Sequence, residues 1–230
     1  MRTVIVWALA VVILSISTSS NANEITITQI GDNLDMDITQ SGGNNIVKGP
    51  FWDSVMDGND NTVLFHQEHS DGTYANIIEY GYIVGDDNNV EVRQGSDNLG
   101  GNGVRSDSTE YSGHYAHVGV IGDDNTVRIG QRNPDDSPHS AWAVIMADGA
   151  DVEITQGSSN TKDAEVWVQN DNSNISVLQD GSGLHTAFID TYGTGPSTID
   201  LTQGGSTSQF YSLSQYCTNA NGCAVTVTQN

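Results

Sequence analysis

The chain has very few basic residues. Lysine and arginine together number 7 in 230 residues, against 29 aspartates and glutamates, so the formal net charge is −22 at pH 7. Proteins that bind nucleic acid or anionic lipid need clusters of Lys and Arg to neutralise phosphate groups. Their scarcity argues against both kinds of partner. Copies of so acidic a chain repel one another at low salt and are screened as the ionic strength rises.

Cysteine is scarcer still, with only Cys217 and Cys223. In a chain exported to an oxidising compartment, two cysteines this close in sequence favour a local disulfide. Two free thiols are the alternative. A zinc site is disfavoured, because the segment 216–230 contains no histidine and no acidic residue that could complete the ligand set.

Long apolar runs are confined to the beginning of the sequence. Arg2 is followed by an apolar run over residues 4–14 and by small residues over 15–22, the layout of a secretory signal peptide. The run is shorter than the roughly 20 residues of a membrane-spanning helix, which favours cleavage over a retained anchor. We therefore expect a leader over 1–22, one domain over 23–230, no transmembrane segment in the mature chain, and a secreted, extracellular protein associated with the cell surface.

Motifs of catalysis are also missing. The sequence has no Gly-x-Ser-x-Gly, zinc or phosphate-loop motif. His66 and His69 are three residues apart, as are His114 and His117, but on a strand this spacing places the two side chains on opposite faces. We expect no enzyme, and no catalytic, cofactor-binding or metal-ligating residues.

The acidic turn sequences leave calcium binding as an open alternative. Clusters such as 85–88 and 122–125 recur just before or between the strands described below. Oxygen-rich turns at regular spacing could hold calcium. Asp, Asn and Gly are equally the ordinary residues of turns, so calcium remains an alternative rather than an expected cofactor.

The chain does contain a repeated strand pattern. Eight segments read apolar-x-apolar-x-Gln, so that in each the two apolar side chains and the glutamine leave the same face of a strand. The intervening residues are mostly polar, which indicates one buried and one exposed face. The glutamines of this pattern are Gln29, Gln67, Gln94, Gln131, Gln156, Gln179, Gln203 and Gln229.

The spacing of these glutamines predicts the architecture. Most successive pairs are about 25 residues apart, which suits one coil of two strands and two turns. We therefore expect an all-β, two-strands-per-coil solenoid of seven to eight coils, with loop insertions near 49–60 and 100–115 where the interval is longer. The expected opposite strands are Met36-x-Ile38-x-Gln40, Val118-x-Val120, Val144-x-Met146, the stretch 166–169 and Tyr211-x-Leu213-x-Gln215.

An inward glutamine needs hydrogen-bond partners, since a buried unsatisfied amide costs about 1–3 kcal/mol. Stacked coils about 4.8 Å apart supply them, because the amide of one glutamine can donate to the carbonyl of the next. A slip of one residue would break this pairing. The glutamines are thus expected to form a ladder that sets the register, while the apolar residues provide burial.

At this point the repeat resembles the curlin repeats of bacterial curli fibres, which read approximately Ser-x5-Gln-x-Gly-x-x-Asn-x-Ala-x3-Gln. Gln-x-Gly occurs at Gln29 and Gln179, and six of the eight glutamines have Asn or Ser six residues earlier. The resemblance implies export across an outer membrane, a β-solenoid subunit and head-to-tail stacking into an amyloid-like adhesive fibre. The residues six positions before a glutamine are Asn23, Asn61, Asn88, Asn125, Ser173 and Ser197.

We therefore expect a secreted structural protein, a curli-like fibre or biofilm-matrix subunit that promotes adhesion and aggregation by self-association or by association with related subunits. The absence of an evident cap at either end of the repeats supports this hypothesis. The alternative is a monomeric solenoid that acts as a calcium-dependent or carbohydrate-binding module. Aromatic residues such as Tyr80, Tyr82, Trp142 and Trp167 could then bind a surface polysaccharide, although they could equally pack the irregular strand face.

Overall fold

The structure is a computed structural model that describes residues 24–25, 35–41, 45–49, 56–68, 76–95, 114–132 and 138–230. Every regular element within these ranges is a β-strand. Accordingly, no helix in the described part of the chain is long and apolar enough to cross a membrane. The expected leader over 1–22 lies outside these residues.

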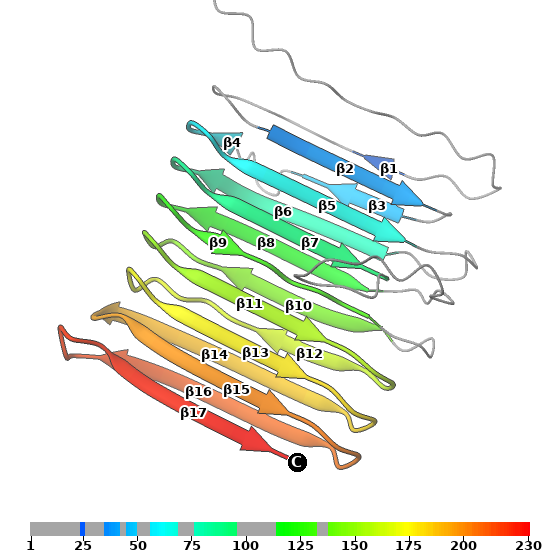
Figure 1. The fold of residues 1–230 in the computed structure, drawn as a ribbon, viewed down its shortest axis with the longest axis vertical. Helices are drawn as coiled ribbons and strands as arrows, with labels where there is room; N and C mark the ends of the chain where they lie inside the picture. Colours follow the sequence, from blue (N-terminus) through cyan, green and yellow to red (C-terminus); the bar gives the residue numbers. More distant parts are fainter. Residues whose placement is uncertain are drawn as a thin grey trace, which may run out of the picture.

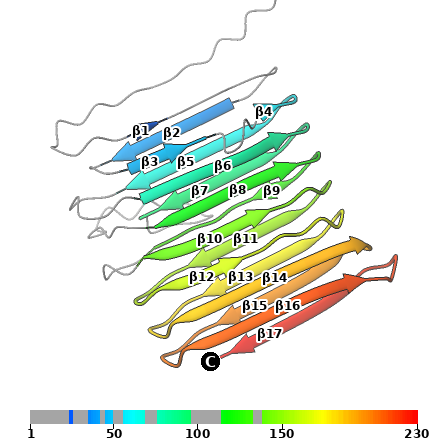
Figure 2. The same cartoon turned by 180° about the vertical axis from the view of Figure 1, so that it is seen from behind.

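The strands form two parallel sheets, which we call sheet A and sheet B (Figure 1). The chain passes between them as it winds, so each coil contributes to both, and Figure 2 shows the same stack from behind. The predicted all-β, two-strands-per-coil solenoid is therefore confirmed. Sheet A contains β1 (Glu24–Ile25), β3 (Asn45–Lys48), β4 (Met56–Asp57), β6 (Asn76–Val84), β8 (Tyr115–Ile121), β10 (His139–Val144), β12 (Lys162–Glu165), β14 (His185–Thr194) and β16 (Gln209–Cys217). Sheet B contains β2 (Asp35–Ser41), β5 (Thr62–Glu68), β7 (Asn89–Gln94), β9 (Thr126–Val127), β11 (Asp151–Gln156), β13 (Asn174–Gln179), β15 (Ser197–Gln203) and β17 (Cys223–Gln229).

The core lies between the two sheets. Sheet B contributes the two apolar residues of each repeat, such as Val152 and Ile154 of β11, both fully buried. Sheet A contributes large apolar side chains such as Ile78, Tyr80 and Ile189, together with a column of alanines at matched positions of successive strands. These alanines follow residues whose carbonyls accept bonds from the sheet B glutamines, so their small size leaves room for the amides. The column consists of Ala116, Ala141, Ala164 and Ala187.

The first coil differs from the prediction. Gln29 was expected in the ladder and Gln40 in the opposite strand, but β1 pairs with β3 of sheet A, and β2 pairs with β5 so that Gln40 lies beside Gln67. Both strands of this coil carry apolar-x-apolar-x-Gln, so the pattern could not tell them apart, whereas strand pairing does. Gln29 itself lies outside the described residues.

The insertion expected near 49–60 is also corrected. Its described part, from Met56 onward, is not a protruding loop, because β4 pairs with β6 and the turn after it stacks on the turn 85–88. The long interval that suggested an insertion arose from counting Gln29, since Gln40 and Gln67 are only 27 residues apart. Of the insertion expected near 100–115, only His114 and Tyr115 are described, and Tyr115 begins β8.

One predicted opposite strand has its faces reversed. Val144 and Met146 were expected to point inward, but the buried residues are Ala143 and Ile145, and Met146 is exposed. A shift of one residue reverses both faces of a strand. Because Ala143 is small, the inward pair Ala143 and Ile145 did not stand out as apolar in the sequence. In the other expected opposite strands, Val118, Val120, Val166 and Val168 are buried, and Tyr211 and Leu213 are partly buried.

The coil corners depend on glycine at a few positions. Gly85 and Gly122 have φ angles of 119° and 116°, a region that favours glycine. A Cβ on Gly122 would lie 2.2 Å from the carbonyl oxygen of Ala147 in the next coil. The corners can therefore stack closely only without a side chain at this position.

Gly122→Ala is expected to destabilise the fold by about 1–3 kcal/mol, because it adds both backbone strain and a clash with the next coil. Gly119→Ala is the matched control, since a Cβ at Gly119 meets nothing within 4 Å. Urea unfolding followed by circular dichroism measures both variants. Equal stability of the two would show that the corners are not close-packed.

Candidate assembly interface

The glutamines of sheet B form a continuous ladder. From Gln40 to Gln229, the Nε2 of each glutamine donates to the Oε1 of the next at 2.8–3.0 Å. The interior members are fully buried. The expected inward ladder is thus confirmed for Gln67, Gln94, Gln131, Gln156, Gln179, Gln203 and Gln229, with Gln40 as an additional member.

The same amides also join the two sheets. Each Nε2 has a second hydrogen, and in Gln131, Gln156 and Gln179 it reaches a backbone carbonyl at the start of a sheet A strand, at 2.6–2.8 Å. The ladder therefore fixes the register along the stack and the spacing across it. A side chain that cannot make both bonds leaves a buried carbonyl or amide unsatisfied.

A second ladder lies at the opposite corner of the coils. Asn88 donates from Nδ2 to Gly122 O at 2.8 Å, and its Oδ1 accepts from the backbone N–H of Asn125 at 2.9 Å. Asn61 and Asn125 make the equivalent bonds. These asparagines stand six residues before a ladder glutamine, which gives that sequence position its physical role: it closes the corner between sheet A and sheet B.

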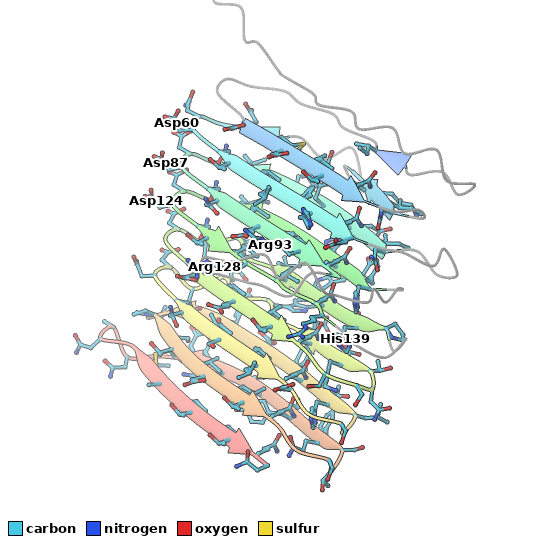
Figure 3. The ribbon with its side chains drawn as sticks, turned by 45° about the vertical axis from the view of Figure 1, so that its right-hand side comes forward. Asp60, Asp87, Arg93, Asp124, Arg128 and His139 are labelled. Atoms are coloured by element: carbon cyan, nitrogen blue, oxygen red, sulfur yellow. A yellow bond between two sulfur atoms is a disulfide. The ribbon has the colours of Figure 1, made fainter. Side chains whose placement is uncertain are left out.

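Aspartates line the outside of this corner. Figure 3 shows Asp60, Asp87 and Asp124 one above another along this edge of the stack. Inside the same turns, Asp123 Oδ1 accepts the backbone N–H of Asp86 at 2.8 Å, and Asp148 Oδ1 accepts that of Asp123 at 2.9 Å. These carboxylates therefore bind the preceding coil. Across the described residues, no three His, Cys, Asp or Glu side chains converge as a metal site would require.

A polar column at the start of the sheet A strands was not predicted. It consists of buried inward residues in register, and His114 and His139 have ring centroids 5.0 Å apart. The spacing of His114 and His117 was interpreted only as evidence against a metal pair, although the matching positions of His114 and His139, two residues before Ala116 and Ala141, were a usable signal. The column contains Asn45, Asn76, His114, His139, Lys162 and His185.

Hydrogen bonds hold His139 in one neutral form. Its Nδ1 accepts the backbone N–H of Lys162 at 3.3 Å, so the ring proton lies on Nε2, which donates to Arg132 O at 2.9 Å. Burial lowers the pKa of His139 to about 4, and the neighbouring positive charge of Lys162 adds to this effect. A second proton would have to displace the N–H that Nδ1 accepts.

Lys162 is buried below His139 and is solvated by the backbone. Its Nζ donates to the carbonyls of Ser159, Asn160 and Gly183 at 2.6–3.0 Å. Burial lowers the pKa of this amine, an effect that the negative charge of Asp180 opposes. In His185, the next residue of the column, burial likewise lowers the pKa. Burial therefore makes protonation of His139, Lys162 and His185 less favourable inside the stack than in water.

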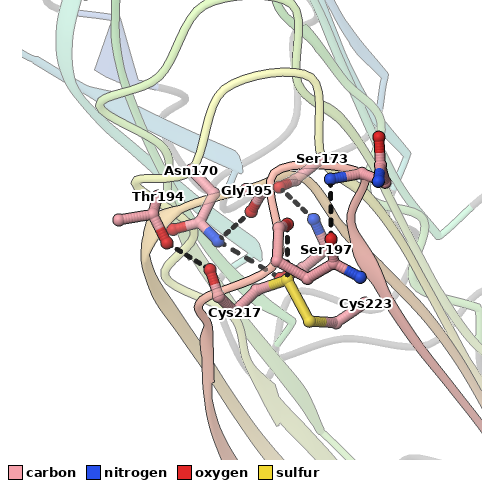
Figure 4. The surroundings of a disulfide bond; sticks show 9 residues. Asn170, Ser173, Thr194, Gly195, Ser197, Cys217 and Cys223 are labelled. Carbon is pink, nitrogen blue, oxygen red and sulfur yellow. Dashed lines mark hydrogen bonds between the residues drawn. A yellow bond between two sulfur atoms is a disulfide. The ribbon is translucent and has the colours of Figure 1, made fainter.

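A disulfide joins Cys217 at the end of β16 to Cys223 at the start of β17, with Cα atoms 5.7 Å apart (Figure 4). Cys223 stands six residues before Gln229, a position that is Asn or Ser before six of the seven earlier glutamines of the pattern and Ala150 before Gln156. In the preceding coil, the corner is closed instead by Ser173 Oγ, which accepts the N–H of Ser197 at 2.9 Å. The covalent bond thus replaces the corner hydrogen bonds at the edge of the described stack.

β17 is the edge strand of sheet B, and β16 is the edge strand of sheet A. Their inward residues are only half-buried, whereas the same positions one coil earlier are buried. Tyr211, Leu213 and Val227 pack against the core on one side and are otherwise uncovered. This surface, formed by β16 and β17, is the candidate assembly interface, which we call the edge face.

Comparison with known proteins adds no assignment: no protein-family model, no curated protein and no solved structure matches this chain. The β-solenoid with its buried ladders is therefore the finding on which any functional conclusion depends. The resemblance to curlin repeats remains a sequence-based prediction.

Gln156→Leu is expected to lower the free energy of unfolding by on the order of 3 kcal/mol, because it leaves the bonding groups of Gln131, Gln179 and Ser140 without their partner. Thr155→Ala, on the outer face of the same strand, should cost no more than about 0.5 kcal/mol. Chemical denaturation measures both. Similar losses would contradict the role of the ladder.

Stability is expected to decrease as the pH falls from about 6.5 to about 4. The unfolded chain binds a proton at His139 in this range and the folded chain does not, so acid favours unfolding by up to about 3 kcal/mol for this residue. His139→Asn, which introduces a residue that the column already uses, should lose less stability between pH 7 and pH 4.5 than the wild type.

His66→Asn is the control for this pH dependence, because His66 lies on the outer face of β5 and is partly exposed. Thermal melts at both pH values measure the difference between the variants. An identical acid-induced decrease in wild type and His139→Asn would show that the buried histidine is not its source.

Proposed function

We propose that this protein is a structural subunit that assembles head to tail through its edge face, giving a fibre or matrix that promotes adhesion outside the cell. The observation that carries this proposal is the edge face itself. Its strands have half-covered apolar residues, and beyond them no further strand pairs among the described residues. Such edges are templates for another chain. The proposed partner is a second copy or a related subunit.

The backbone of β17 supports the proposal. Cys223 N–H donates to Pro196 O, and Gln229 O accepts from Gly204 N–H, so these residues face β15. Because alternate residues of a parallel strand point to opposite sides, the N–H and C=O groups of Ala224, Thr226 and Thr228 face away from β15. They are the donors and acceptors that an added strand requires.

Register provides a second argument. β2 is in register with β5 through Gln40 and Gln67, and β15 with β17 through Gln203 and Gln229. Placing β2 of one copy on β17 of another in the same register aligns Gln229 with Gln40. Val225 and Val227 then lie beside Met36 and Ile38, and both apolar pairs would gain burial. The interface between the two copies would then have the same register as the contact between successive coils within one copy.

The charge of the chain sets the conditions for assembly. Copies with a net charge of −22 repel one another, and this repulsion weakens as salt shortens the screening length from about 30 Å at 0.01 M to about 8 Å at 0.15 M. Assembly is therefore expected to be slow at low ionic strength and faster in physiological salt.

Thr226→Pro is expected to abolish assembly while leaving the subunit folded. Proline removes an N–H that faces the open edge, and proline is tolerated on edge strands at such positions. The wild-type chain should give thioflavin-positive filaments with a 4.7–4.8 Å reflection in 0.15 M salt, and the variant should remain monomeric.

Thr226→Ala is the matched control, because it removes the side chain but keeps the N–H, and it should assemble as the wild type does. Circular dichroism checks that both variants fold. If the wild type remains monomeric at high concentration and high salt, or if Thr226→Pro assembles normally, head-to-tail stacking through β17 is wrong.

A further inference from the structure

The exposed large apolar side chains are concentrated on one side of the solenoid. Apart from Leu178 and Leu184, they project outward from sheet A or from the segments that continue its strands. Four of them are aromatic, and we call this group the aromatic face. Its members and their exposed fractions are Trp167 (47%), Tyr192 (58%), Phe210 (69%) and Tyr216 (59%).

Trp167 is fixed in place with its carbon surface outward. Its indole Nε1 donates to Glu165 Oε1 at 2.7 Å, and its ring meets Phe188 edge to face with centroids 6.4 Å apart. Because the only polar atom of the indole is satisfied, the exposed part of the ring is apolar. A partner of this ring therefore has to offer C–H groups rather than hydrogen-bond donors or acceptors.

Tyr216 is held against the backbone of the preceding coil. A Cβ on Gly193 would lie 2.8 Å from a ring carbon of Tyr216, so the ring rests where Gly193 has no side chain. Gly193 also has a φ of 85°, which favours glycine there. The ring is supported on one side and exposed on the other, which is the arrangement of a stacking platform.

We propose that the aromatic face binds a neutral, extended β-linked polysaccharide. The C–H faces of pyranose rings stack on aromatic carbon, and their hydroxyls donate to carboxylates and hydroxyls, which this face supplies at Asp190 and Ser214 between the aromatic positions. Trp167, Tyr192 and Tyr216 belong to three successive coils. Glu165 pairs with Phe188, so Trp167 comes level with Asp190, whereas the Tyr216 ring lies beside Gly193. The exposed rings therefore follow a diagonal across the face, and an extended sugar chain laid along this diagonal contacts more than one ring.

The acidic charge of this face favours a neutral polymer as its partner over a second copy of the chain or an anionic polymer. Asp163, Glu165 and Asp190 project from the same face, so a second copy laid against it would bring carboxylates together. Uronic-acid polymers are repelled by the net charge of −22. A neutral chain of sugars is not repelled by these carboxylates or by the net charge. Its extended length also suits a surface that continues over several coils.

This inference does not depend on head-to-tail assembly. The aromatic side chains project from the outer face of sheet A, whereas assembly uses the inward residues and the open backbone edge of β16 and β17. Phe210 and Tyr216 are in β16 but project from its outer face. A monomer can therefore bind the polysaccharide, and a filament would repeat the site along its length. Binding measured on the Thr226→Pro variant keeps the two proposals separately testable.

Retention by insoluble polysaccharide tests the proposal. Microcrystalline cellulose and chitin are the neutral probes, and alginate beads are the anionic comparison, all with the full chain in 0.15 M salt. The wild type should be retained by at least one neutral polymer and not by alginate. Trp167→Ala and Tyr192→Ala should each weaken retention about tenfold, the effect of truncating a well-placed aromatic anchor.

Leu178→Ala is the matched control, because Leu178 is an exposed apolar residue on the opposite sheet. It should bind as the wild type does, and thermal melts check that all three variants fold. Absence of retention by both neutral polymers, preference for alginate, or equal retention of Trp167→Ala and Leu178→Ala would each overturn the proposal.

Discussion

The structure depends on the need to satisfy a buried amide in every coil. A glutamine in an apolar core must find partners for two hydrogens and a carbonyl, and only the next coil in exact register, together with the opposite sheet, provides them. The ladder from Gln40 to Gln229 meets this requirement throughout. Coil length, strand register and the distance between the sheets all follow from that constraint.

The two sheets divide the remaining tasks. Sheet B carries the two apolar residues and the glutamine of each repeat, so its strands resemble one another in sequence. Sheet A places alanines beside the amides and polar residues such as His139 and Lys162 at the start of its strands. Its outer face is consequently the less constrained one, and that is where aromatic side chains are exposed. The binding and assembly surfaces we propose thus lie on different sides of one scaffold.

Much of sheet B could be predicted from the sequence, because a period of two combined with a glutamine is a strong signal. Sheet A was harder, because Ala141 and Ala143 give no apolar pattern and the outward Val144 imitated one. The first coil was misassigned because its two strands share a pattern that only strand pairing resolves. The polar column escaped notice because residues far apart in sequence become neighbours only once the coils are stacked.

The direction of the ladder has a consequence for anything built from this subunit. Every Nε2 donates the same way, from Gln40 toward Gln229, so the row of amides has a donor end and an acceptor end. Two like ends would set amide against amide or carbonyl against carbonyl. A filament made by continuing the ladder is therefore polar, with all subunits pointing the same way and two chemically different tips that need not grow at the same rate.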